Sequence, residues 1–120
     1  MPTANVFRDF EKVAIAKLCS HALSADDLDA ILKHAEFVSL DHTSVGYFLT
    51  IRHDVLPQQR TVCSEPLLVG RGTNVDIGFV VFLENRELTL ECHAWSAEAL
   101  PRNIRDLPVS VREPETDHES

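Results

Sequence analysis

The sequence predicts a single α+β domain in which two N-terminal helices pack on one face of a curved, mainly antiparallel sheet of four to six strands. Two patterns support this fold class. Hydrophobic residues recur at three- and four-residue spacing up to about residue 35, and from Glu36 onward they alternate with polar residues. The chain has 120 residues, a length typical of one domain with its own core. We expect residues 1–112 to form this domain and residues 113–120 to form an acidic, disordered tail.

Two amphipathic helices are expected first. The first covers residues 5–22, and Glu11 is assigned to its polar positions. Its apolar stripe comprises Phe7, Phe10, Ala14 and Leu18, widened by Val13 and Ile15. The second helix begins after Ser24, a residue type that caps helices, with Asp27 three residues later. Its predicted buried stripe comprises Leu28, Ile31, Leu32 and Ala35, and a residue or two separates the two helices.

A period of two predicts the strands that follow. They are placed at residues 36–41 and 45–52, within 62–69, and at 108–111, with turns or loops at 42–44, 53–61 and 70–74 and a turn or short helix at 102–106. Pro66 suggests an edge position for the strand within 62–69, since proline cannot donate to a strand ladder. Gly46 and Gly78 lie inside strand patterns, which predicts β-bulges or strong curvature.

The strongest strand signal is a hairpin of residues 75–83 and 87–95 with a tight turn at 84–86, where Asn85 best tolerates a left-handed conformation. Alternation divides its second arm between two faces. Leu88, Leu90 and Cys92 point toward the helices, and Glu87, Glu91, His93 and Trp95 point away from them. The first arm is hydrophobic on both faces, so the face away from the helices is predicted to be a cleft or a contact surface.

The predicted binding residues are therefore Glu87, Glu91, His93 and Trp95. A carboxylate beside an imidazole can raise the histidine pKa or orient its tautomer for acid–base chemistry, with Arg52 or His53 as further candidates nearby. The interpretation that assigns no function is that Glu91 and His93 are an ordinary half-exposed pair on a strand. Cys92 cannot pair directly with His93, because neighbours on a strand point to opposite faces, and no catalytic residue is assigned.

Composition narrows the classes of partner. Six histidines and three cysteines show no zinc-ligand spacing, so no metal or cofactor is predicted. The odd cysteine count, with neither a signal-peptide pattern nor an apolar run of membrane-spanning length, predicts a cytoplasmic protein. The formal net charge is −8, and half of it comes from residues 113–120. This charge argues against nucleic acid and anionic membranes as partners and is compatible with a basic protein.

Two stretches resemble elements of a family of small, uncharacterised bacterial proteins. Thr43-Ser44-Val45-Gly46-Tyr47-Phe48 is similar to that family's Thr-Gly-Val-Gly-Phe-Phe element, with Ser44 where the family has glycine. Ile77-Gly78-Phe79-Val80-Val81-Phe82 with Leu90-Glu91 resembles a Gly-Phe-Val-Leu-Phe strand that leads through a tight turn to a strand ending in Leu-Glu. The resemblance covers most of the chain and implies the same fold, but no activity.

These features favour a protein-binding domain, either an immunity-like inhibitor of a basic partner or a homodimer. The likeness to bacterial immunity proteins is one of type, since these are small, acidic, cytoplasmic α+β proteins without catalytic motifs. The alternative is a small-ligand-binding protein or an enzyme that uses a polar pocket on the same sheet face. A deep cavity lined by Glu91 and His93 would favour the alternative, and a flat face would favour protein binding.

Overall fold

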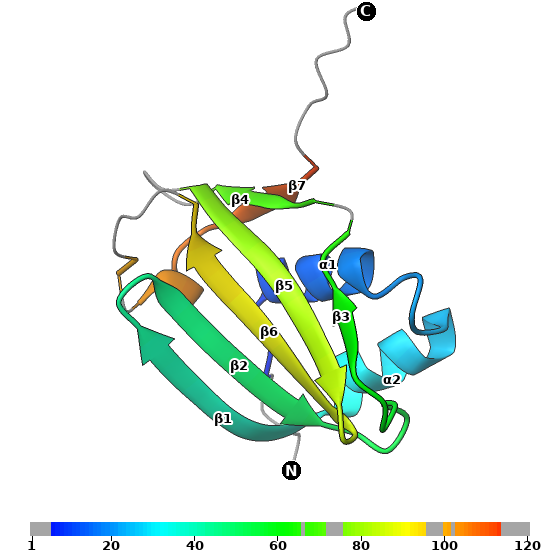
Figure 1. Ribbon diagram of the computed structural model, residues 1–120. Coiled ribbons are helices and arrows are strands. Elements are labelled where there is room, and N and C mark those ends of the chain that lie inside the picture. The colour runs from blue at the N-terminus through cyan, green and yellow to red at the C-terminus, as the bar shows by residue number, and fades with distance from the viewer. Residues whose placement is uncertain (1–5, 66, 72–75, 96–99, 102, 114–120) are drawn as a thin grey trace, which may run out of the picture.

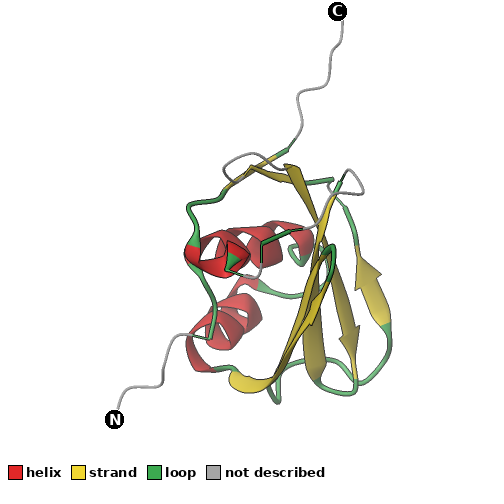
Figure 2. Cartoon of the chain, turned by 90° about the vertical axis from the view of Figure 1, so that its left-hand side faces the viewer, coloured by secondary structure: helices red, strands yellow, loops and turns green. Residues whose placement is uncertain are grey.

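Two α-helices cover one face of a seven-stranded antiparallel sheet (Figure 1, Figure 2). The computed structural model describes residues 6–65, 67–71, 76–95, 100–101 and 103–113. Within these residues no helix lies over the opposite face of the sheet. The α+β class and the packing of helices on a sheet are confirmed, with one strand more than the predicted range allowed. We call the helix-covered side of the sheet the inner face and the other side the outer face.

The second helix starts where its sequence predicts, whereas the first begins later and ends earlier than predicted. α1 (Asp9–Leu18) is shorter than expected, so residues 19–24 connect it to α2 (Ala25–His34) in place of a one- or two-residue corner. The predicted cap of α2 is confirmed, because the Ser24 hydroxyl accepts a hydrogen bond from the Asp27 backbone N–H at 3.1 Å. Val13 is 41% exposed, so the first stripe is narrower than predicted.

Seven strands and one short 3₁₀ helix follow the two α-helices. They are β1 (Glu36–Thr43), β2 (Gly46–Arg52), β3 (Thr61–Cys63), β4 (Val69–Arg71), β5 (Asp76–Glu84), β6 (Glu87–Ala94), η1 (Ile104–Asp106) and β7 (Ser110–Arg112). The sheet order is β1-β2-β6-β5-β4-β7, and β3 also pairs with β5. The single strand predicted within 62–69 is thus two strands, β3 and β4, which flank Pro66, itself outside the described residues. Gly70 and Arg71, expected in a loop, belong to β4.

The predicted hairpin of β5 and β6 forms the middle of the sheet. Its two-residue turn contains Asn85 and Arg86 with φ of 56° and 61°, so both take the left-handed conformation that such tight turns require. Arg86 is the less expected of the two, and its side chain explains why it is tolerated. Its Nη1 donates to the carbonyl oxygens of Asp54 at 2.8 Å and Leu56 at 3.2 Å. The loop after β2 therefore supports the turn.

The bulges predicted at the two strand glycines are wrong. The ladder is continuous at Gly46 and at Gly78, and the one irregularity of β1 lies between Phe37 and Ser39. Gly46 has a different role. A Cβ atom there would lie 1.8 Å from the Cys92 carbonyl oxygen, so only glycine lets β2 and β6 approach this closely.

The inner face buries the hydrophobic side chains of the sheet against the helices. Its fully buried members include Leu49, Ile51, Ile77, Val81, Leu83, Leu88 and Leu90. Cys92 is 1% exposed among them, which confirms the orientation predicted for the second arm of the hairpin. Burial raises the Cys92 pKa to about 12, so this thiol stays protonated near neutral pH.

One carboxylate lies within this core. Glu11 is fully buried, although the sequence analysis assigned it to the polar side of its helix. Its oxygens accept hydrogen bonds from the Arg8 backbone N–H at 2.7 Å, the Tyr47 hydroxyl at 2.5 Å, and the Arg105 Nε and Nη2 at 2.7 and 2.8 Å. The hydrogen bonds to Glu11 hold the pKa of Arg105 above its usual value. Burial raises the pKa of Tyr47.

Two further predictions concern the ends of the chain and membranes. The acidic tail predicted at residues 113–120 lies outside the described residues from residue 114 onward. Of the helices in the described ranges, neither α1 nor α2 has the length and hydrophobicity needed to cross a membrane.

Candidate functional site

The structure brings the four predicted binding residues to one side of the sheet. Glu87, Glu91 and His93 point outward from β6, because the alternate residues Leu88, Leu90 and Cys92 point into the core. Trp95 directly follows β6, and its ring lies beside His93 over β5. No described helix covers them, so this outer face is an exposed surface at the middle of the sheet (Figure 1).

Strand register defines the neighbours of Glu91. It lies across from Phe48 on β2 and Val80 on β5, both of which are half-buried on the outer face. Its carboxylate therefore sits between two hydrophobic side chains. Its one ion-pair partner among the described residues is the His93 imidazole, whose Nδ1 lies 3.8 Å from Glu91 Oε2. This distance is too long for a hydrogen bond, so the pair interacts only electrostatically, and only when the imidazole is protonated.

His93 lies between two glycines, Gly46 on β2 and Gly78 on β5. A Cβ atom on Gly78 would lie 2.3 Å from Trp95 Nε1 and 2.7 Å from His93 Nε2. Glycine at this position thus lets both rings rest on the sheet surface. The His93 Nδ1 atom is buried there and has no hydrogen-bond partner among the described residues.

A cavity of about 330 Å³ opens on the outer face near the β5–β6 turn. Its lining residues are Phe48, Arg60, Phe82, Glu84, Asn85, Glu87 and Thr89. Glu87 is the only predicted binding residue among them, since Glu91, His93 and Trp95 lie outside this cavity. This cavity is therefore not the enclosed pocket, lined by Glu91 and His93, that would favour catalysis by these two residues.

The two residues proposed to assist Glu91 lie elsewhere. Arg52 pairs across the sheet with Glu87, four positions from Glu91 along β6, which corresponds to about 13 Å. His53 follows β2, and its Nδ1 accepts a hydrogen bond from the Val55 backbone N–H at 3.1 Å. The structure thus brings neither Arg52 nor His53 to the Glu91–His93 pair.

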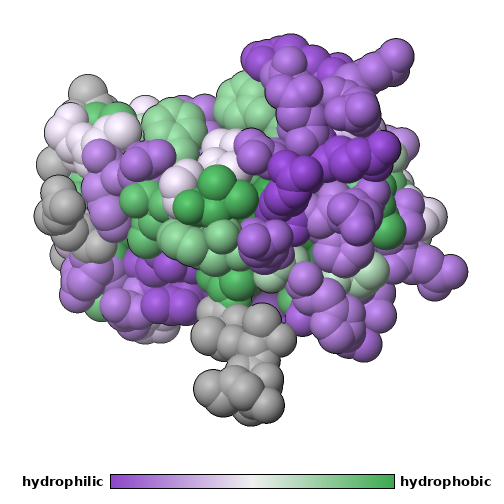
Figure 3. Space-filling view, turned by 90° about the horizontal axis from the view of Figure 1, so that it is seen from below, coloured by the Kyte–Doolittle hydropathy of each residue, from purple (hydrophilic) through white to green (hydrophobic). Residues whose placement is uncertain are grey.

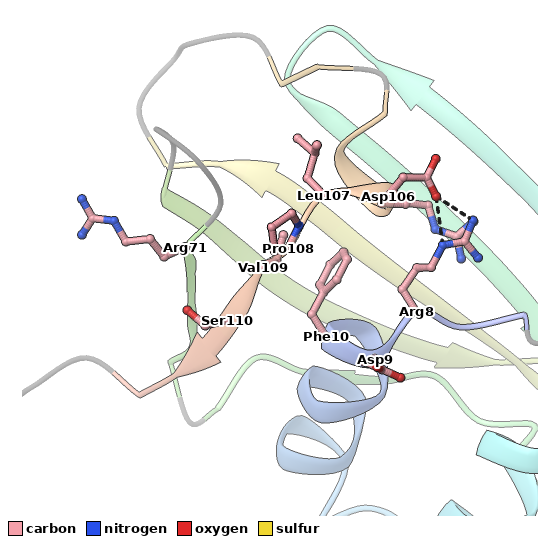
Figure 4. A pocket seen from close by; sticks show the side chains of 10 residues that line it. Arg8, Asp9, Phe10, Arg71, Asp106, Leu107, Pro108, Val109 and Ser110 are labelled. Atoms are coloured by element: carbon pink, nitrogen blue, oxygen red, sulfur yellow. Dashed lines mark hydrogen bonds and ion pairs between the residues drawn. The ribbon is translucent and has the colours of Figure 1, made fainter.

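A second cavity, of about 760 Å³, lies where the start of α1 meets the segment leading to β7 (Figure 4). Three arginines line it, but each already has an acidic partner. These pairs are Arg8–Asp106 at 3.1 Å, Arg105–Glu11 at 2.7 Å and Arg71–Asp76 at 3.5 Å. In Figure 4 the Arg71 side chain points away from Phe10 and Arg8. Each described arginine that lines this cavity is therefore already ion-paired.

Sequence reasoning missed the buried Glu11–Tyr47–Arg105 network, although a signal for Glu11 was present. Glu11 lies four residues after Phe7 and three before Ala14, so it falls within the apolar stripe of α1. A carboxylate at such a position must have hydrogen-bonding partners. Nothing local identifies Tyr47 and Arg105 as those partners, because they are far away in sequence.

Metal and thiol chemistry find no support in the described ranges. No group of three or more His, Cys, Asp or Glu side chains is positioned there to bind a metal ion. Cys19, Cys63 and Cys92 are free and buried, and burial raises the pKa of each thiol. None of them has the exposed, acidic thiol typical of a nucleophile.

Comparisons with protein-family models, with curated proteins and with solved structures found no match. The family resemblance based on residues 43–48, 77–82 and 90–91 therefore stays a prediction.

Proposed function

We propose that this domain binds a basic protein partner through the outer face of β2, β6 and β5, as an immunity-like inhibitor does. The observation that supports this proposal is an uncovered central sheet surface on which carboxylates alternate with half-exposed hydrophobic and aromatic side chains. Hydrophobic groups with a polar surround are the usual composition of protein interfaces. A sheet surface of this kind accommodates a protein better than it encloses a small molecule.

Charge supports a basic partner in particular. The chain has a formal net charge of −8, and Glu91 has no cation nearby in the described structure except His93. A lysine or arginine from a partner would give this carboxylate an opposite charge in a partly desolvated place between Phe48 and Val80. Trp95, 45% exposed beside them, is of the residue type most enriched among dominant binding residues.

The alternative, a small-ligand site or enzyme on the same face, has one observation in its favour. His93 Nδ1 is buried without a described hydrogen-bond partner, and the Glu91 carboxylate lies 3.8 Å away. A ligand donor or acceptor could satisfy this nitrogen. Because the outer-face cavity does not include these two residues, the geometry supports protein binding better.

Self-association is the other candidate for protein binding. β1 is an edge strand, and Phe37 and Val38 near its start are 53% and 43% exposed. Figure 3 views the lower end of the molecule and shows hydrophobic side chains gathered among hydrophilic ones there. An exposed edge strand with hydrophobic side chains is a template for pairing with a second copy. The experiment below distinguishes this homodimer from a basic partner.

We also propose a cytoplasmic location. The support is that all three cysteines are free, as is usual in a reducing compartment.

The experiment is affinity capture from the native host with three forms of the full chain. They are the wild type, Glu91→Lys on the outer face and Asp29→Lys on α2, which makes the same charge change in the helix layer. We expect the wild type and Asp29→Lys to retain one basic protein, identified by mass spectrometry, and Glu91→Lys to lose it. Raising the NaCl concentration from about 0.05 to 0.5 M should release it, because salt screens charge attraction.

Three outcomes would overturn the proposal: equal capture by wild type and Glu91→Lys, capture of no basic protein by the wild type, or equal loss with Asp29→Lys. Size-exclusion chromatography of the purified forms adds a separate control. A wild-type dimer that Glu91→Lys dissociates would assign the outer face to a second copy of the chain, whereas a dimer that persists in Glu91→Lys would fit pairing through the β1 edge.

A further inference from the structure

The outer-face cavity combines aromatic walls with carboxylates. Phe82 from β5 lies opposite Thr89 on β6, and Phe48 from β2 lies on the other side of β6, opposite Glu91. The Thr89 hydroxyl is already hydrogen-bonded to that of Thr50 at 2.9 Å, so this lining side chain is held in place. Glu84 and Glu87 close the end near the turn.

The chain's own side chain indicates which chemical group this cavity accepts. The Arg60 guanidinium carbon lies 5.6 Å from the centre of the Phe82 ring, within the range of a cation–π contact. Its Nη1 lies 3.3 Å from Glu84 Oε1. Arg60 nevertheless lies only at the rim of the cavity. Its side chain is 61% exposed, and a cavity volume of about 330 Å³ remains open beside it.

The second carboxylate of the cavity is left without a cation. Glu84 and Glu87 lie directly opposite each other across the hairpin, an arrangement that like charges disfavour. Arg60 neutralises Glu84, but no ion pair joins Glu87 to any described lysine, arginine or histidine. Arg52, its cross-strand neighbour, makes no such pair either. A second cation entering the cavity would therefore reduce the repulsion at the hairpin end.

We infer that this cavity binds an arginine side chain of the basic partner, with its guanidinium paired to Glu87 and stacked on Phe82. This inference rests on the proposed function, and it identifies the part of the outer face that binds an arginine of the partner. Arginine fits better than lysine, because its flat guanidinium both stacks on aromatic rings and donates two parallel hydrogen bonds to a carboxylate. Arg60 occupies part of the same site in the unbound protein and so weakens binding.

The test uses N-acetyl-arginine amide as the probe, titrated into the full chain and followed by backbone amide chemical shifts. N-acetyl-citrulline amide, its uncharged isostere, and N-acetyl-lysine amide are the matched ligands. We expect arginine to shift the amide signals of Phe82, Glu87 and Thr89, lysine to do so more weakly, and citrulline not at all. Glu87→Gln should weaken arginine binding about fivefold or more.

Arg60→Gln should strengthen arginine binding about threefold, because it frees the Phe82 face and Glu84. Asp29→Asn on α2 is the control and should leave binding unchanged. Equal shifts with citrulline, no shifts with arginine, or weaker binding by Arg60→Gln would overturn the inference. Unchanged emission from Trp95 verifies that each variant is folded.

Failure of this inference differs from failure of the proposed function. If Glu87→Gln still captures the basic protein as the wild type does, while Glu91→Lys does not, the face binds the partner but the arginine pocket is wrong. If arginine binds the cavity and Glu91→Lys captures the protein normally, the pocket exists but the wider face is not the interface.

Discussion

Two glutamates on opposite sides of the sheet, Glu11 on α1 and Glu91 on β6, have very different surroundings. Glu11 on the inner side is fully buried and accepts four hydrogen bonds, two of them from one arginine. Glu91 on the outer side has a side chain that is 29% exposed, and its one ion-pair partner among the described residues is a histidine imidazole at 3.8 Å. The first has every partner that a buried charge requires, whereas the second does not.

Glu11 is thus a charge that stabilises the fold, whereas Glu91 is a charge that is available to bind a partner. The Glu11 network joins α1, β2 and the 3₁₀ segment η1, which are distant in sequence. Removing it should therefore change stability. Glu91 makes no such connection, so its removal should change binding and leave stability nearly unaltered.

The largest expected effect comes from the same substitution at both positions. Glu11→Gln should lower the free energy of unfolding by about 3–5 kcal/mol, because an amide group would face the Arg105 donors inside the core. Glu91→Gln should lower it by less than about 0.5 kcal/mol. Urea unfolding monitored by circular dichroism measures both. Similar losses at the two sites would contradict the division of roles.

Alanine substitutions at the two strand glycines should also differ in their effect on stability. Gly46→Ala places a Cβ atom 1.8 Å from a backbone oxygen and should cost about 3 kcal/mol, because strands must move apart. Gly78→Ala meets the Trp95 and His93 side chains, which can rotate away, so it should cost about 1 kcal/mol. It should also shift the fluorescence of Trp95, the only tryptophan, to longer wavelength. An unshifted spectrum would mean that the ring does not rest on Gly78.

Tyr47→Phe should cost about 1–2 kcal/mol, since it removes one hydrogen bond to the buried Glu11 carboxylate. The pH dependence follows from the raised pKa of Tyr47 in the folded state. The folded protein keeps this proton while the unfolded chain loses it near pH 10, so stability should fall as the pH rises above about 10.

Because Tyr47 is the only tyrosine, phenolate absorbance reports this titration directly. We expect no phenolate signal from the folded chain at about pH 11, where an exposed tyrosine is mostly ionised. A normal tyrosine titration in the folded protein would contradict the buried network.

The smallest effect is expected at an exposed pair on α2. Asp29 and Lys33 lie 3.1 Å apart, with side chains more than half exposed. Asp29→Asn should change the free energy of unfolding by less than about 0.5 kcal/mol, because water and salt screen such pairs. The same unfolding measurement on Asp29→Asn gives the baseline for the other variants. A loss above about 1 kcal/mol in its free energy of unfolding would mean that the losses at Glu11 and Tyr47 are not specific to the buried network.

Local patterns were sufficient for most of the fold. The cap at Ser24, the hairpin of β5 and β6, and the orientation of Leu88, Leu90 and Cys92 follow from residue spacing that the sequence displays directly. The split of one predicted strand into β3 and β4 did not, because both are short and pair with the same strand.

The candidate site was predicted only in part. Alternation on β6 placed Glu87, Glu91 and His93 on one face, but it said nothing of their cross-strand neighbours. That Phe48 and Val80 flank Glu91, and that Arg60 reaches Phe82, depends on register and on a loop. Such contacts join residues far apart in the chain, where spacing rules give no information.

Side-chain footprinting of the complex with the captured basic protein tests the central claim most directly, because it distinguishes the two faces of a sheet. Hydroxyl radicals label accessible side chains, and Trp95, Phe48 and Phe82 should each become protected on binding. Val13, 41% exposed on α1, should be labelled equally with and without the partner. Protection of the helix layer with unchanged labelling of Trp95 would contradict the assignment of the outer face as the binding surface.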